Sequence, residues 1–126
     1  MELEQQVCSL ELAKRLKELG VKQDSVFFYI VDSDDGYIGV RPINPTKNDG
    51  DSNRRFSAFT VAELGELLPT GIQTYRTSRI PGYSCRVFGP GKPKVWAALG
   101  HRQRDTNEAN ARAKMLIYLL ENKLIQ

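Results

Sequence analysis

Hydrophobic residues near the start of the chain recur with the spacing of an amphipathic helix. Ser9 can cap this helix through its hydroxyl group, and Gly20 can end it because a helix C-terminus often needs a left-handed residue. Four apolar residues would form its inner side: Leu12, Ala13, Leu16 and Leu19. The pattern therefore predicts a helix from about Ser9 to Leu19.

The next segment, Val26 to Val31, consists of β-branched and aromatic residues and predicts a buried strand. Asp32 to Gly36 is typical of a turn, and Tyr37 to Ile43 has the composition of a returning strand. We therefore predict a hairpin. Residues 44–55 have little to bury and predict a mobile loop.

A short helix is predicted after this loop. Thr60 and Glu63 have the spacing of a capping box, and Phe59 can pack against Leu64 as a hydrophobic staple. Pro69 limits the length of the helix because proline disrupts helical hydrogen bonding.

Three segments of strand character follow, over 73–80, 83–88 and 94–103, with Gly and Pro residues between them. Such short connections predict an antiparallel meander. The last helix would begin at Asp105 and Thr106, with Glu108 three residues after Asp105. Its apolar stripe consists of Ala109, Ala113, Leu116, Ile117, Leu120 and Leu124. A stripe this wide must be covered, and the preceding strands are the nearest cover.

These elements predict an α+β fold for a single domain over residues 1–126. We expect a predominantly antiparallel sheet of about five strands packed with three helices. The order would be helix, two strands, short helix, three strands and long helix.

The composition is that of an ordinary globular protein, with 40% hydrophobic and 26% charged residues. The polar, acidic start does not resemble a signal peptide, and the longest apolar run, Met115 to Leu120, is too short to cross a bilayer. We therefore expect a cytoplasmic protein without a membrane partner.

Charge is distributed unevenly along the chain. Residues 1–70 contain 8 Lys or Arg and 12 Asp or Glu, a net charge of −4. Residues 71–126 contain 10 and 3, a net charge of +7. The basic part of the chain could therefore attract an acidic partner.

The basic strands also carry aromatic residues. Strand alternation predicts one face with cations and aromatic rings, a composition that suits single-stranded nucleic acid because phosphates seek charge and bases stack on rings. The candidate nucleic-acid-binding residues on this face are Arg76, Arg86, Lys94, Arg102, Trp96 and Phe88. The alternative is structural: a helix covers Phe88 and Trp96 while the arginines extend to the rim.

Metal binding and catalysis have little support in the sequence. Cys8 and Cys85 are interpreted as buried free thiols, and His101 provides no recognised metal-ligand spacing with them. Asp32 to Gly36 fails the spacing of a calcium loop. We predict no cofactor, no metal site and no enzyme. The alternative is an enzyme or a small-ligand binder, if the fold closes a pocket around His101, Tyr83 and Trp96.

The predicted order of strands followed by a helix is also similar to that of double-stranded-RNA-binding domains. Those domains place lysines at the start of their last helix. The acidic segment 105–108 has the wrong charge for that role.

Three stretches resemble a family of small uncharacterised proteins of phages, prophages and other mobile elements. These stretches are VCSLELAKRLKELGVKQDS over 7–25, SAFTVAELGELLP over 57–69 and DTNEANARAKMLIYLLENKLI over 105–125. The last one also looks like the closing helix of phage alpha-beta-alpha sandwich domains. The resemblance implies a cytoplasmic setting in a bacterial host, but it assigns no activity or site residues.

Two hypotheses follow for the function. The first is a non-enzymatic accessory protein that serves as an interaction module for an unknown host or phage protein. The second is a nucleic-acid-binding protein that uses the basic, aromatic sheet face.

Overall fold

The computed structural model describes residues 3–32, 36–42, 55–77, 82–88 and 98–125. Within these residues, the helices are α1 (Leu3–Gln6), α2 (Leu10–Glu18), α3 (Val61–Leu67) and α5 (Glu108–Glu121). The strands are β1 (Phe27–Asp32), β2 (Gly36–Pro42), β3 (Arg55–Ser57), β4 (Ile72–Arg76), β5 (Tyr83–Val87) and β6 (Arg102–Asp105).

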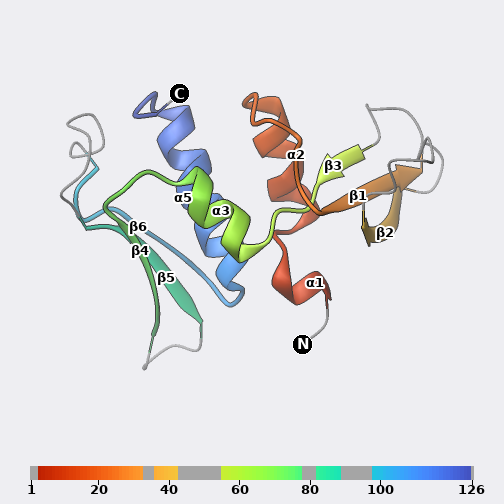
Figure 1. Cartoon of the computed structure of the whole chain (residues 1–126). Helices are drawn as coiled ribbons and strands as arrows, with labels where there is room; N and C mark the ends of the chain where they lie inside the picture. Colours follow the sequence, from red (N-terminus) through yellow and green to blue (C-terminus); the bar gives the residue numbers. More distant parts are fainter. Residues whose placement is uncertain (1–2, 33–35, 43–54, 78–81, 89–97, 126) are drawn as a thin grey trace.

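The strands form two separate antiparallel sheets, with the orders β2-β1-β3 and β4-β5-β6. Helices α2, α3 and α5 lie between them, as Figure 1 shows. The α+β class and the order of the main elements agree with the prediction. The additional described elements are α1 and β3, and Arg55, at the end of the predicted loop, begins β3. The rest of that loop lies outside the described residues.

Helix α2 forms as its local sequence predicts. The Ser9 side chain accepts a hydrogen bond from the Leu12 amide, and Gly20 has a φ of 87°. Val21 N donates to Leu16 O over 3.1 Å, which closes the helix end by the expected left-handed motif. The capping box of α3 is also confirmed, because Thr60 and Glu63 exchange their side-chain and backbone hydrogen bonds.

Helix α5 is the central element of the fold. Ala109, Ala113, Leu116 and Ile117 of the predicted stripe are buried, and so are Ala111, Met115 and Leu119 on other sides of the helix. Burial on several sides arises because α5 contacts the β4-β5-β6 sheet as well as α2 and α3. The covering of the last helix by strands is therefore confirmed.

The predicted start of the last helix is wrong by a few residues. Asp105 is the final residue of β6 and lies opposite Tyr83 of β5, so its backbone is extended. The cap is Asn107, whose side chain accepts a hydrogen bond from the amide of Asn110 over 3.1 Å.

The predicted strand over 94–103 is displaced in the same direction. Ala98 to Gly100 form a turn in which His101 N donates to Ala98 O over 2.8 Å. Gly100 has a φ of 86°, a left-handed conformation that lies outside the β region of a regular strand. Residues 94–97 lie outside the described residues.

The N-terminal segment is joined to the opening turn of α5. Ser9 N donates to Asn110 Oδ1 over 2.7 Å, and Asn107 Nδ2 donates to Val7 O over 3.3 Å. Cys8 N donates to Phe59 O over 3.0 Å. These bonds connect the start of the chain with α5 and with the segment that precedes α3.

Candidate functional site

The β4-β5-β6 sheet has one face that packs inward. Cys85 and Val87 of β5 are buried, and α5 contacts all three strands. Side chains directly opposite one another in an antiparallel sheet lie on the same face. Thr74 and Gln103, the partners of Cys85, therefore share its inward face, and the intervening residues point to the other side.

The other side of the sheet has an ordered arrangement of residues. Tyr75, Ser84 and Arg104 form one row across the three strands, and Gln73, Arg86 and Arg102 form the next row. Phe88 follows two residues after Arg86, and Arg86 Cζ lies 5.2 Å from the centroid of its ring. We call this set the outer face: Gln73, Tyr75, Ser84, Arg86, Phe88, Arg102 and Arg104.

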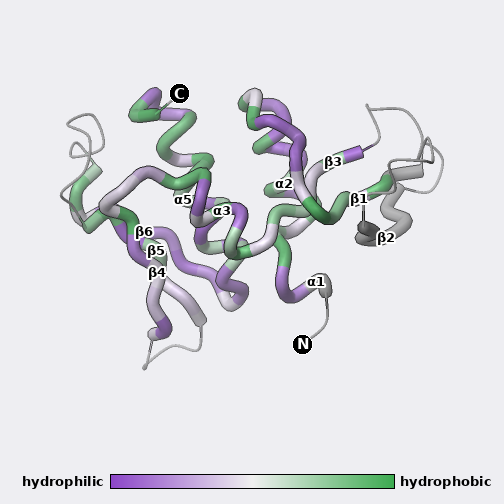
Figure 2. The backbone as a smooth tube through the Cα atoms, viewed as in Figure 1, coloured by the Kyte–Doolittle hydropathy of each residue, from purple (hydrophilic) through white to green (hydrophobic). Residues whose placement is uncertain are grey.

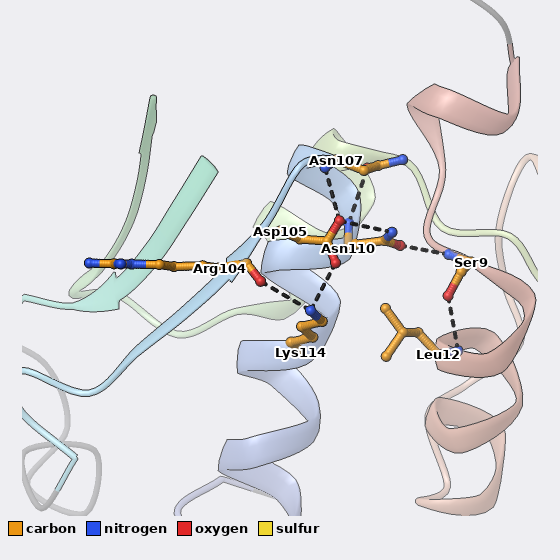
Figure 3. Close-up of polar contacts among 7 residues, drawn as sticks. All are labelled: Ser9, Leu12, Arg104, Asp105, Asn107, Asn110 and Lys114. Carbon is orange, nitrogen blue, oxygen red and sulfur yellow. Dashed lines mark hydrogen bonds and ion pairs between the residues drawn. The ribbon is translucent and has the colours of Figure 1, made fainter. Parts of the chain in front are cut away.

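Figure 3 shows that two neighbouring side chains at the end of β6 point in opposite directions. The Arg104 side chain extends away from α5, whereas Asp105 points toward it. Asp105 Oδ2 lies 2.8 Å from Lys114 Nζ, and Lys114 Nζ also donates to the Arg104 carbonyl oxygen over 3.0 Å. These contacts fix the last residues of β6 on α5 and leave the Arg104 guanidinium group on the outer face.

The outer face is strongly positive. Arg86 and Arg102 are directly opposed, and Arg104 follows on the same side of β6. Among the ion pairs of the described residues, none involves these three arginines. Like charges opposite one another in a sheet destabilise the fold, so the arrangement has a cost that folding alone does not explain.

The positive charge of the outer face also affects the pKa of Tyr75. The neighbouring Ser84 hydroxyl and the guanidinium groups of Arg102, Arg86 and Arg104 lower the pKa of this phenol below its ordinary value. Ser84 Oγ has no hydrogen bond of ordinary geometry among the described residues, so we attribute the effect mainly to the arginines. Tyr75 therefore lies within the positive field of the outer face.

The aromatic rings of the outer face are accessible. Phe88 is 49% exposed and Tyr75 is 38% exposed. No described helix covers Phe88, because α5 packs on the opposite side of the sheet. Figure 2 shows β6 as hydrophilic along its length. A basic surface with exposed rings can bind an anionic ligand that has planar groups.

The structure brings together three of the predicted site residues: Arg86, Phe88 and Arg102. Arg76 lies opposite Tyr83 and therefore belongs to the inward face, with its Cζ 6.0 Å from the Tyr83 ring. The predicted shared face for Arg76 is wrong because the register of β4 differs by one residue. Lys94 and Trp96 lie outside the described residues.

Two outer-face residues were not predicted. The register that turns Arg76 inward turns Tyr75 to the outer face, and Arg104 lies beyond the segment 94–103 that was expected to form the last strand. The sequence did indicate the face of Arg104. It follows Arg102 by two positions, and residues two apart in a strand share a face.

His101 and Tyr83, the two described residues of the suggested pocket with Trp96, do not lie together. His101 O accepts a hydrogen bond from Val87 N, whereas Tyr83 lies at the other end of β5, roughly 13 Å away along the strand. His101 instead stacks on Tyr118, with their ring centroids 3.6 Å apart, and contacts Gln103 through its Nε2 atom over 2.8 Å.

A cleft of about 980 Å³ lies beside Tyr83 and Arg76. It reaches the capping residue Thr60 of α3 and the Asn107 cap of α5. Glu108, its acidic residue, pairs with Arg112 over 3.3 Å. The lining is mostly of hydroxyl, amide and apolar groups, which can hold a polar molecule without providing a specific chemistry.

The described residues contain no cluster of three or more His, Cys, Asp or Glu side chains suited to a metal ion. They also contain no helix whose length and apolar character would let it cross a bilayer. Comparison with models of protein families, with curated proteins and with solved structures gave no match to this chain.

Proposed function

We propose that this protein is a non-enzymatic binding module and that the outer face of its β4-β5-β6 sheet binds nucleic acid. The main support is the group of Arg86, Arg102 and Arg104, which lie together without a carboxylate partner among the described residues. Bound phosphate groups would reduce the repulsion between these charges. Binding would also release the counterions of the nucleic acid.

The exposed rings favour nucleic acid over an acidic protein surface. Carboxylates would neutralise the arginines equally well, but they would leave Phe88 and Tyr75 without planar partners. A phage or prophage accessory role in the bacterial cytoplasm, as the sequence resemblance implies, remains a part of the same proposal.

Fluorescence anisotropy with labelled oligonucleotides at low salt tests the proposal. The variant Arg102→Gln/Arg104→Gln should weaken binding, because each lost phosphate contact also reduces the steepness of the salt dependence. The matched control is Lys22→Gln/Lys123→Gln, which removes the same charge from two exposed positions away from the sheet. Equal affinities of the two double variants would contradict the proposal.

A further inference from the structure

The positions of the two rings on the outer face carry a more specific inference, which rests on the proposed function. Tyr75 lies in the row of Ser84, and Phe88, which directly follows β5, is four residues beyond Ser84. The two rings are therefore separated by roughly 13 Å along the strand direction. The row of Arg86 and Arg102 lies between them.

We infer that the ligand of the outer face is single-stranded nucleic acid, with bases stacked on Tyr75 and Phe88 and with the intervening phosphates bound by Arg86 and Arg102. This order of ring, cations and ring matches a nucleic-acid strand whose sugar-phosphate backbone crosses the middle of the outer face. A base on each side can then turn toward a ring.

The accessibility of the rings distinguishes a single strand from a duplex. In a duplex the flat sides of the bases are covered by their neighbours, so only phosphates and groove edges remain for a sheet surface. In a single strand the flat sides are free to stack on aromatic side chains. Phe88 and Tyr75, which are 49% and 38% exposed, would contribute to binding only in the second case.

Arg86 is held against the ring of Phe88. Its guanidinium carbon lies 5.2 Å from the centroid of the Phe88 ring, within the range of a cation–π contact. The charged planar group thus lies over the ring, and Phe88 is still 49% exposed. This arrangement offers a phosphate contact and a stacking contact to neighbouring parts of one nucleotide.

The test compares binding of one sequence of about 10 nucleotides as single-stranded DNA, single-stranded RNA and a DNA duplex. We expect the single strands to bind more tightly than the duplex. Tyr75→Leu and Phe88→Leu should each weaken single-strand binding about tenfold, with an unchanged salt slope and unchanged duplex binding. Tyr75→Phe, which keeps the ring, is the matched control and should bind as the wild type does.

The possible failures are distinguishable. If duplex and single strands bind equally and both leucine variants bind as the wild type does, this inference is wrong while the proposed function stands. If no oligonucleotide binds, or if poly-glutamate binds as tightly as the oligonucleotides, the proposed function fails and the inference fails with it. Thermal unfolding of each variant, monitored by circular dichroism, establishes that the fold is retained.

Discussion

Arg86 of β5 lies directly opposite Arg102 of β6, and neither has a carboxylate partner among the described residues. Two cations at opposed sheet positions repel one another, so the pair lowers the stability of the sheet. A surface that keeps such a pair without neutralising it is suited to an anionic ligand.

The repulsion between Arg86 and Arg102 leads to a first prediction, about the stability of the protein. Arg102→Gln should raise the free energy of unfolding by about 0.5 kcal/mol at low salt, because it removes one of two opposed charges. The gain should shrink at high salt, where the repulsion is screened. Urea unfolding at two salt concentrations measures both effects. A loss of stability at low salt would show that Arg102 contributes to the fold instead.

A second prediction concerns the pH dependence of the β6–α5 connection. Burial alone would raise the pKa of Asp105, but hydrogen bonds from Lys114, the Asn107 amide and Asn110 outweigh it and lower this pKa below 3.8. A carboxyl group with a lowered pKa stabilises the fold at higher pH and loses that contribution as pH falls through its folded-state pKa.

Asp105→Asn should therefore cost about 1 kcal/mol of unfolding free energy at pH 7, and the cost should decrease below pH 3.8. Denaturant unfolding at several pH values checks this expectation. Asp24→Asn, which changes an exposed carboxylate, is the control and should have little effect. An Asp105→Asn penalty that stays constant down to pH 3 would argue against a role for the charge.

The two cysteines should be unreactive in the folded protein. Both are buried and free, and burial raises the pKa of Cys8 to about 12 and also raises that of Cys85. Because the thiolate is the reactive form, neither thiol should react with dithionitrobenzoate at pH 8 until the protein unfolds. Two thiols should then react in denaturant. Rapid labelling of the native protein would contradict the burial of these side chains.

Gly65 of α3 makes room for Arg112 of α5. A methyl group at Gly65 would collide with Arg112 Nη1, which donates to Val61 O over 3.0 Å. Gly65→Ala should therefore destabilise the protein by about 1 kcal/mol, although alanine is the better helix residue. In an Arg112→Ala background the same change should stabilise by about 0.5–1 kcal/mol. Chemical unfolding of the four proteins measures this reversal, and additive effects would refute it.

Local signals in the sequence were sufficient to predict several elements. The Ser9 cap, the left-handed Gly20 and the Thr60–Glu63 capping box act within a few residues, so the sequence pattern alone indicates their hydrogen bonds. The antiparallel pairing of β4, β5 and β6 was also predictable, because short connections favour neighbouring strands.

Features that depend on distant contacts were not predicted correctly. Asp105 resembles a helix cap in sequence, but pairing with Tyr83 keeps it in β6 and Lys114 of α5 binds its carboxylate. The division of the strands into two sheets depends on the position of α5 between them, which burial of Ala111 and Met115 reflects.

The register of β4 decided how much of the site could be predicted. Thr77 N donates to Gly82 O over 3.0 Å, and this connection sets Tyr75 opposite Ser84. A shift of one residue exchanges the faces of Tyr75 and Arg76, and the sequence provided no signal to choose between them. Arg86, Phe88 and Arg102 did not depend on that choice and were grouped correctly.

The central claim is that the arginines of the outer face bind phosphates. Its most direct test is the salt dependence of single-strand binding by the wild type and by the variant Arg86→Gln/Arg102→Gln/Arg104→Gln. Three phosphate contacts predict a slope of log K against log salt of about −2 for the wild type and a nearly flat line for the variant. Equal slopes for the two proteins would contradict the account.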